Sequence, residues 1–185
     1  MDNNKHQKLS MDALNRISAD DFKKIEKAPF VIVLDNIRSM NNVGSFFRTA
    51  DAFALEAIYL CGITATPPNK EIHKTALGST ESVDWKYYKE TTEAIAELKN
   101  QGFYVCAIEQ VTQSVFLHEF NFQAHEKLAF VFGNEVFGVN EEVIELCDEC
   151  IEIPQIGTKH SLNVSISGGI VMWHAFAKWN EKREQ

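Results

Sequence analysis

The chain has 185 residues, of which 45% are hydrophobic, a size and composition that predict one domain with its own core. No apolar run approaches the roughly 20 residues of a bilayer-spanning helix, and the polar N-terminal residues lack a signal-peptide core, so we expect a cytoplasmic protein without a membrane segment. The formal net charge of −8 weighs against a large nucleic-acid footprint, although acidic residues crowd into 141–152 and basic groups collect elsewhere.

The four cysteines suit a reducing compartment. Cys61 and Cys106 lie in apolar, strand-like runs and are expected to be buried thiols. Cys147 and Cys150 form one C-x-x-C pair, but no second Cys or His pair stands at metal-ligand spacing. A structural role is therefore favoured over a zinc or redox site, and we expect no metal.

The predicted elements alternate between helices and strands along the chain. Residues 10–27 have a loose apolar face at helical spacing and predict a helix, which Pro29 ends. Short apolar runs predict strands at residues 29–35, 57–62, 85–90, 103–109, 128–133 and 150–154. Further helices are predicted at residues 41–55, 91–102, 140–147 and 161–178, whereas residues 72–85 fit no single state. The alternation predicts an α/β fold, a parallel sheet with helices on both faces.

Three polar segments follow predicted strands, at residues 35–50, 133–140 and 154–169. Because ligands of parallel sheets bind beyond the carboxyl ends of the strands, we expect these segments to converge on one edge. None contains G-x-G-x-x-G or a Walker A loop, so a nicotinamide dehydrogenase or an ATP-binding protein lacks support.

Structural explanations stay open for individual residues in these segments. The helix at 41–55 is expected to be capped by Asn41 or Asn42. Arg48, about one turn into that helix, either reaches back toward the strand ends or forms a surface salt bridge. Glu135 is either a site residue or an ordinary loop acid. Helix capping accounts for one of four closely spaced polar residues, which are Ser161, Asn163, Ser165 and Ser167.

Three motifs stand in register within these segments. The first is N-x-G-x-x-x-R-T-A, here Asn42, Gly44, Arg48, Thr49 and Ala50. The second is F-G-N-E followed by a glycine, here Phe132, Gly133, Asn134, Glu135 and Gly138. The third is I-P, then G, then S-L-N-V-S, here Ile153, Pro154, Gly157 and the residues 161–165. In order and separation they resemble the SpoU/TrmH family of RNA ribose 2′-O-methyltransferases, of the SPOUT superfamily, over roughly residues 30–178.

The resemblance implies a fold and an assembly. It implies a methyltransferase domain at residues 29–185, ending in a deep trefoil knot, with residues 1–28 as an N-terminal helical extension. Threading of a knot would explain Gly168 and Gly169 inside a helix, where glycine is otherwise unfavourable. It also implies a homodimer, for which the apolar C-terminal helix is suited, although core packing explains that helix equally well. Gln155, where relatives often carry Met, departs from the family pattern.

The resemblance also implies roles for individual residues. S-adenosylmethionine would be held by backbone groups at Gly133, Ile153 and Leu162. The catalytic residues would be Arg48, Glu135, Ser161 and Asn163, and Asn42 and Arg48 would bind substrate. Since guanidinium stays protonated, we expect Arg48, from its own or the partner's subunit, to orient the ribose hydroxyl rather than act as a base. Glu135 would hold Arg48 or Asn163 in place.

The sequence therefore predicts an S-adenosylmethionine-dependent RNA 2′-O-ribose methyltransferase. A nucleotide in a tRNA loop is the favoured target, and an rRNA target is the alternative within the class. A catalytically inactive RNA-binding or assembly protein is the alternative outside it, but the catalytic motif residues are intact. Phosphate contacts should make RNA binding strongly dependent on salt.

Overall fold

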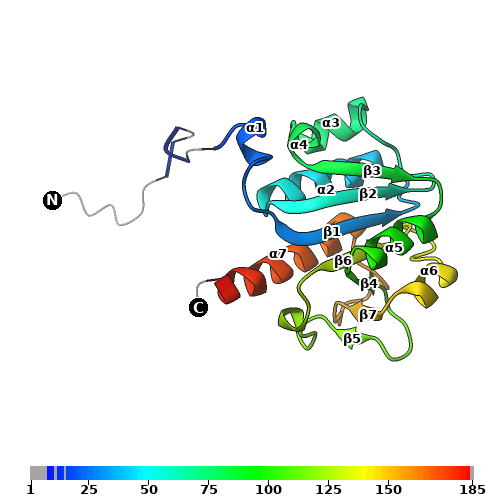
Figure 1. The fold of residues 1–185 in the computed structure, drawn as a ribbon. Helices are drawn as coiled ribbons and strands as arrows, with labels where there is room; N and C mark the ends of the chain where they lie inside the picture. Colours follow the sequence, from blue (N-terminus) through cyan, green and yellow to red (C-terminus); the bar gives the residue numbers. More distant parts are fainter. Residues whose placement is uncertain (1–7, 11, 15, 184–185) are drawn as a thin grey trace.

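The computed structural model describes residues 8–10, 12–14 and 16–183. Within them, seven strands form one sheet in the order β3-β2-β1-β6-β4-β7-β5, and all neighbouring strands are parallel (Figure 1). The strands are β1 Ala28–Asp35, β2 Leu55–Cys61, β3 Asp84–Tyr88, β4 Tyr104–Ile108, β5 Val115–Phe116, β6 Leu128–Phe132 and β7 Glu149–Glu152. The predicted parallel α/β class is confirmed, and the two-residue edge strand β5 is an addition to it.

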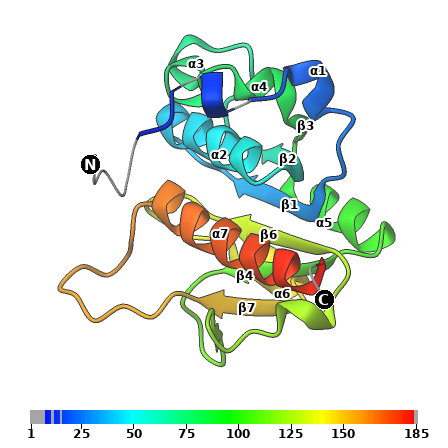
Figure 2. The ribbon, with the colours of Figure 1, turned by 90° about the vertical axis from the view of Figure 1, so that its left-hand side faces the viewer.

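Helices cover both faces of the sheet (Figures 1 and 2). One layer contains α2 Met40–Ala52, α3 Lys70–Ala76 and α7 Val164–Arg183, with the short elements α1 Ala19–Phe22, α4 Ser79–Ser82 and η2 Phe122–Ala124. The opposite layer contains α5 Thr91–Asn100 and α6 Glu141–Leu146. The expectation of helices on both faces is confirmed.

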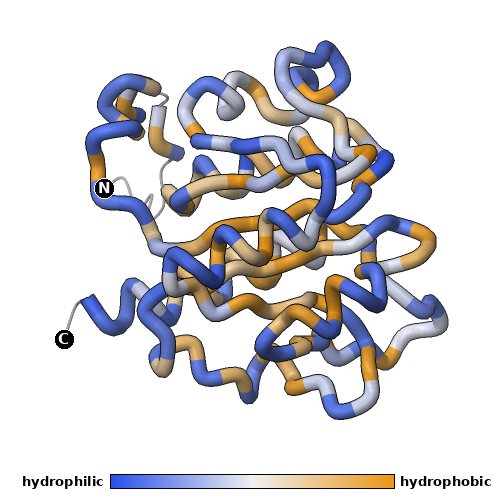
Figure 3. The backbone as a smooth tube through the Cα atoms, turned by 45° about the vertical axis from the view of Figure 1, so that its right-hand side comes forward, coloured by the Kyte–Doolittle hydropathy of each residue, from blue (hydrophilic) through white to orange (hydrophobic). Residues whose placement is uncertain are grey.

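The central strands divide their side chains between two cores. In β1, Phe30, Ile32 and Leu34 pack toward α2 and α7, whereas Val31 and Val33 pack toward α5 and α6. This division follows from the period of two along a strand. Hydrophobic segments accordingly concentrate at the central strands, whereas the surface segments are largely hydrophilic (Figure 3).

The edge that carries the carboxyl ends of the strands positions the site. Because β1 lies between β2 and β6, the chain passes from one half of the sheet to the other beside β1. Such a reversal is where open parallel sheets bind ligands. Hydrogen bonds join the segments 35–50, 133–140 and 154–169 there, so the expected convergence on one edge is confirmed.

The helix predicted at residues 10–27 is wrong. The described residues form a 3₁₀ turn, η1 Asp12–Leu14, and the one-turn helix α1, while positions 11 and 15 of that prediction lie outside the described residues. Of the apolar residues that suggested the helix, Phe22 is buried, whereas Leu14, Ile17 and Ile25 are exposed. Helical spacing did not suffice because short helices need a packed face to be stable.

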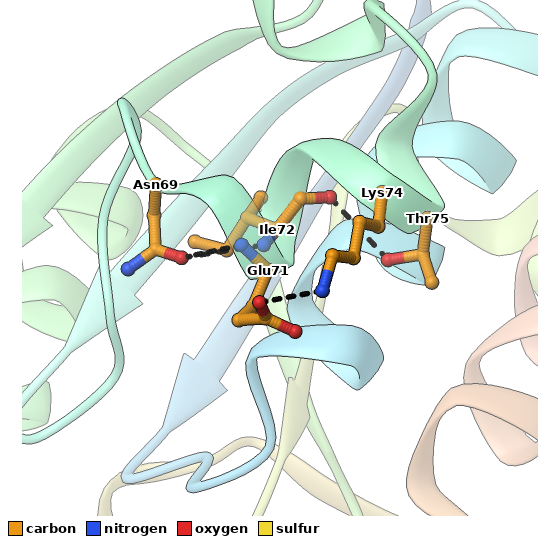
Figure 4. Close-up of polar contacts among 5 residues, drawn as sticks. All are labelled: Asn69, Glu71, Ile72, Lys74 and Thr75. Atoms are coloured by element: carbon orange, nitrogen blue, oxygen red, sulfur yellow. Dashed lines mark hydrogen bonds and ion pairs between the residues drawn. The ribbon is translucent and has the colours of Figure 1, made fainter.

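The segment at 72–85, which fitted no single state, resolves into α3, α4 and the start of β3. Asn69 caps α3, because its Oδ1 accepts hydrogen bonds from the backbone N–H groups of Glu71 and Ile72 (Figure 4). Lys74 pairs with Glu71 at 2.7 Å on the exposed side of the helix, and Thr75 bonds the carbonyl of Ile72 (Figure 4).

The cap of α2 differs from the prediction. Ser39, not Asn41 or Asn42, is its N-cap, and the Ser39 Oγ accepts a hydrogen bond from the Asn42 N–H at 3.3 Å. Gly44 brings α2 close to α3, because a Cβ there would lie 2.1 Å from the Thr75 Oγ1. The side chain of Asn42 is therefore free of capping and available to the site.

The long helix α7 begins three residues later than predicted and lies beside α2 (Figure 2). A Cβ at Gly168 would lie 2.2 Å from Cε1 of Phe46, so glycine is what permits the two helices to approach. At Gly169 a Cβ would meet nothing within 4 Å, so close approach does not explain this glycine. Val171 and Met172 of α7 are buried in the core, which favours core packing for that part of the helix.

The cysteines are free thiols. Cys61 and Cys106 are buried as predicted, and burial raises the pKa of Cys61 to about 12. Cys147 and Cys150 are partly buried against the core on the α5 and α6 side. Among the described residues, no helix is both long and apolar enough to cross a bilayer.

Candidate functional site

A cavity of about 850 Å³ opens at the carboxyl ends of β4, β6 and β7. Apolar side chains such as Phe132, Ile151 and Leu162 form part of its wall. Four carboxylates also line it, Glu109, Glu135, Glu141 and Glu152, and no Lys or Arg of the described chain does. The cavity therefore favours ligands that are partly apolar and that donate hydrogen bonds or carry positive charge.

Glu135 connects the second segment to the first. One carboxylate oxygen, Oε2, accepts from the backbone N–H of Arg38, and the other, Oε1, accepts from that of Ser39, both at 3.0 Å. The Oε1 atom also accepts from Nδ2 of Asn42 at 2.9 Å. The carboxylate thus lies at the N-terminus of α2, where unpaired N–H groups and the helix dipole favour negative charge.

These bonds determine the charge of Glu135. Partial burial alone would raise the pKa of its carboxyl group, but the hydrogen bonds from Arg38, Ser39 and Asn42 outweigh burial and hold the pKa below its usual range. Glu135 is therefore an ionised acceptor at neutral pH, suited to holding neighbouring groups rather than to donating a proton.

Asn42 passes the connection on to the third segment. Its Oδ1 accepts from Nδ2 of Asn163 at 3.2 Å, across 121 positions of sequence. The Oδ1 of Asn163 in turn accepts from the N–H groups of Ser165 and Ile166 at the start of α7, at 2.9 and 3.3 Å. Both ends of the Asn163 amide are thus used, which orients the side chain at the rim of the cavity.

The loop at 133–139 is held tightly on the cavity side. Its Asn134 exchanges two backbone hydrogen bonds with Gly138, and its side chain donates to the carbonyl of Asn36 at 2.8 Å. A Cβ at Gly133 would lie 2.1 Å from the backbone of Gly138 and Val139, so a side chain at 133 would disrupt the loop. The loop therefore presents its backbone to the cavity in one defined shape.

Most of the predicted site residues come together. The cavity wall includes Gly133, Glu135, Ile153, Ser161, Leu162 and Asn163. Asn42 joins this group through its bonds to Glu135 and Asn163. The network thus connects all three segments within one copy of the chain.

Arg48 lies apart from this group. It is exposed, more than two turns into α2 and about 12 Å along the helix axis from Met40, instead of one turn in as predicted. It does not line the cavity, and its guanidinium has no hydrogen bond or ion pair with any described residue. Within one subunit, Glu135 reaches Asn163 through Asn42 and makes no hydrogen bond to Arg48 in the described chain.

Sequence reasoning missed the residues that follow β4. Glu109 and Gln110 line the cavity between the loops after β6 and β7. The available signal was an acidic residue, Glu109, at the end of an apolar strand run. This signal can be interpreted only when the order of the strands in the sheet is known.

Among the described residues, no group of three or more His, Cys, Asp or Glu side chains is placed to hold a metal ion.

Known proteins match this sequence over most of its length. The SpoU rRNA Methylase family matches residues 29–173. The 23S rRNA (guanosine-2′-O-)-methyltransferase RlmB of Neisseria meningitidis serogroup B is 29% identical over 159 residues, 85% of this chain and 62% of that protein. The chain thus spans less than two thirds of the length of that curated relative.

Solved structures agree with the sequence match. The crystal structure of a TrmH/SpoU tRNA modifying enzyme of A. aeolicus superposes with a TM-score of 0.78 at 26% identity, covering 89% of this chain and 83% of that one. An AdoMet-bound rRNA methyltransferase of Sinorhizobium meliloti superposes with a TM-score of 0.75 at 27% identity, covering 83% of this chain and 59% of that one. On the match over residues 29–173, the chain belongs to the SpoU rRNA methylase family.

Proposed function

We propose that the protein is an S-adenosylmethionine-dependent RNA 2′-O-ribose methyltransferase. The observation that carries the proposal is the hydrogen-bonded series Glu135, Asn42 and Asn163 at the rim of the cavity. It brings side chains from three family motifs to one place beside a cavity of suitable size. The site is proposed to lie in a domain of residues 29–185, preceded by an extension at 1–28, in a cytoplasmic protein.

The cavity fits the cofactor. Its apolar wall suits an adenine ring, and the absence of Lys and Arg among its described lining residues suits a ligand that carries a positive sulfonium. The loop at Gly133 leaves backbone groups, not side chains, facing the cavity. Gly133, Ile153 and Leu162 would hold the cofactor, and we propose the knot of the family for the C-terminal segment that carries two of these residues.

The chemistry requires little beyond positioning. When bound, S-adenosylmethionine supplies a methyl group, whose bond to sulfur breaks as a bond to the ribose 2′-oxygen forms and the hydroxyl proton leaves to water or phosphate. Asn163, oriented by Asn42 and by the start of α7, and Ser161 would face the reacting atoms. Arg48 would hold the ribose hydroxyl and the adjacent phosphate through its planar guanidinium.

A homodimer would bring Arg48 to the reaction. On α7, Ile166, Ile170 and Trp173 are 56%, 37% and 57% exposed and lie one turn apart along one face. An apolar stripe of this kind suits burial against a second copy. Arg48 is exposed on α2, which packs against α7, so a partner covering this layer would receive Arg48 in its own site. A monomeric mass in sedimentation would contradict this part of the proposal.

The RNA target is proposed to be an unpaired nucleotide, with a tRNA loop preferred over rRNA. Phe137 is 83% exposed at the cavity, and its N–H and that of Val136 donate to the Asn134 Oδ1, which fixes the loop. Unstacked RNA bases bind aromatic side chains presented in this way. The exposed ring favours a loop or bulge of either RNA over a duplex.

Radiolabelled S-adenosylmethionine, incubated with the protein and with total tRNA or rRNA, tests the function. We expect label in RNA at a mapped 2′-O-methyl nucleotide, within a tRNA loop. Label confined to rRNA would replace the tRNA target by the alternative. Cofactor binding without label in either RNA would favour the inactive RNA-binding protein, and absence of cofactor binding would contradict the proposal itself.

A further inference from the structure

The strand β4 ends in the middle of the cavity floor. Strand order places it between β6, which leads to Gly133, and β7, which leads to Ile153. The two residues after it, Glu109 and Gln110, line the same cavity as those two positions. A ligand held by the loops after β6 and β7 must therefore pass over the end of β4.

Glu109 is held in one orientation by the loop after β6. Its Oε2 accepts from the N–H of Val139 at 3.0 Å, and its Oε1 accepts from the N–H of Gln110 at 2.9 Å. A Cβ at Gly138 would lie 2.2 Å from that Oε2, so the glycine, with φ of +71°, is what lets the carboxylate approach the loop. A carboxylate fixed in this way loses little freedom when a ligand arrives.

The carboxylate still has capacity for a ligand. Each oxygen of Glu109 uses one of two acceptor positions on a backbone N–H, and the residue is only partly buried. Gln110 meanwhile donates from Nε2 to the carbonyl of His160 at 3.3 Å, in the loop after β7. Hydrogen bonds of the two residues after β4 thus hold both loops beside the carboxylate oxygens of Glu109.

The position of the reacting groups indicates which part of the cofactor lies here. Asn163 and Glu135 are joined through Asn42 to the side of the cavity nearest β1 and α2, where the methyl group must be. The adenosine part then extends over β4 and β7, toward Glu109. Two adjacent hydroxyls of a ribose match the two oxygens of a carboxylate, and an acidic residue binds ribose hydroxyls in the dinucleotide-binding fold by the same chemistry.

We propose that Glu109 binds the ribose hydroxyls of the cofactor and selects for a ribonucleoside cofactor. The proposal rests on the function proposed above, because it places the cofactor in the same cavity. Glu109 is a positioning residue for the cofactor and takes no part in the transfer of the methyl group. Loss of its charge should weaken the binding of cofactors that carry the ribose hydroxyls and should leave the binding of cofactors without them unchanged.

Calorimetric titration of Glu109→Gln tests the proposal with three probes. S-adenosylhomocysteine carries all groups, its 2′,3′-dideoxy analogue lacks both ribose hydroxyls, and methylthioadenosine keeps the hydroxyls but lacks the amino acid. Gln can still accept from the N–H of Val139, so the loop keeps its contact. We expect about tenfold weaker binding of S-adenosylhomocysteine and of methylthioadenosine, the loss typical of a hydrogen bond to a charged group, and equal binding of the dideoxy analogue by both proteins.

Two results would overturn the proposal while leaving the proposed function intact. One is a loss of affinity for the dideoxy analogue as large as that for S-adenosylhomocysteine. The other is equal affinity of both proteins for methylthioadenosine, which would mean that Glu109 binds the amine of the cofactor instead of its ribose. Glu142→Gln is the matched control, since Glu142 is exposed on α6 and outside this cavity, and it should bind all probes as wild type. If wild type binds none of the probes, the proposed function and this inference both fail.

Discussion

The rim of the cavity and the outer surface of α2 and α7 differ in how many of their side chains find partners within one copy of the chain. At the rim, Glu135, Asn42 and Asn163 bond one another and two helix starts. On the outer surface, Arg48 has no polar partner among the described residues, and Trp173 is 57% exposed. The rim is preorganised before any ligand binds, whereas the outer surface offers the groups that the proposed RNA and the proposed second copy of the chain would contact.

This contrast predicts its largest effect at Arg48. Arg48→Ala should lower kcat/KM for RNA by about 100-fold or more, the loss typical of one group that stabilises a transition state. Because Arg48 is exposed and lies outside the cavity, the unfolding temperature and the affinity for S-adenosylhomocysteine should not change. Single-turnover methylation and calorimetry measure the two quantities. Arg48→Lys keeps the charge but lacks the planar pair of N–H donors of a guanidinium. Near wild-type turnover in this variant would contradict the orienting role.

In the proposed homodimer, mixed dimers test which subunit's site Arg48 serves. When Arg48→Ala is refolded with Asn163→Ala, a hybrid dimer contains one complete site only if Arg48 acts in the partner's site. Activity should then reappear although each variant alone is inactive. A mixture that stays inactive while forming hybrid dimers would place Arg48 in its own subunit's site.

Two neighbouring glycines of α7 show a similar contrast, because Gly168 is closely packed and Gly169 is not. Gly168→Ala should destabilise the fold by about 1–3 kcal/mol, because the new Cβ would overlap the ring of Phe46. Gly169→Ala should stabilise it by up to about 1 kcal/mol, because Ala is the better helix residue and nothing lies within 4 Å. Urea unfolding of both variants measures the free energies. Equal losses at the two positions would show that Gly169 also packs closely, for example against a second copy.

The exposed ring of Phe137 predicts a smaller effect that is confined to RNA. Phe137→Ala should weaken RNA binding by about tenfold, as expected for one lost base stack. Stability should not change, because the side chain is 83% exposed. Filter binding at fixed salt measures the affinity, and Phe137→Tyr, which keeps the ring, is the control. RNA affinity that is unchanged in the Ala variant would remove the stacking role.

The fold was predictable because strands buried on both faces leave continuous apolar runs, such as residues 29–35 and 128–133. The convergence of the three polar segments followed from a parallel sheet alone. The role of Glu109 was not predictable, because it depends on β4 lying between β6 and β7, which no local pattern encodes. The distance of Arg48 from the cavity was underestimated, because a helix predicted from residue 41 already places Arg48 about two turns in, and the start of α2 at Met40 after the Ser39 cap adds only a small part of a turn.

The preorganised rim predicts its smallest effect in the pH dependence of stability. Because the folded-state pKa of Glu135 is below its ordinary value of 4.5, its ionised form stabilises the fold above that pH, and the contribution disappears as pH falls through the folded-state pKa. Glu135→Gln should therefore be less stable than wild type near neutral pH, and the gap should close as the pH falls through the lowered folded-state pKa of Glu135. Urea unfolding at several pH values measures it, with Glu142→Gln as the control, because the exposed carboxylate of Glu142 has no hydrogen bond to a described residue. The gap should be a fraction of 1 kcal/mol, since the side chain is exposed and solvent screens its interactions. A gap that persists unchanged in acid would mean that Glu135 supports the rim through its shape and not through its charge.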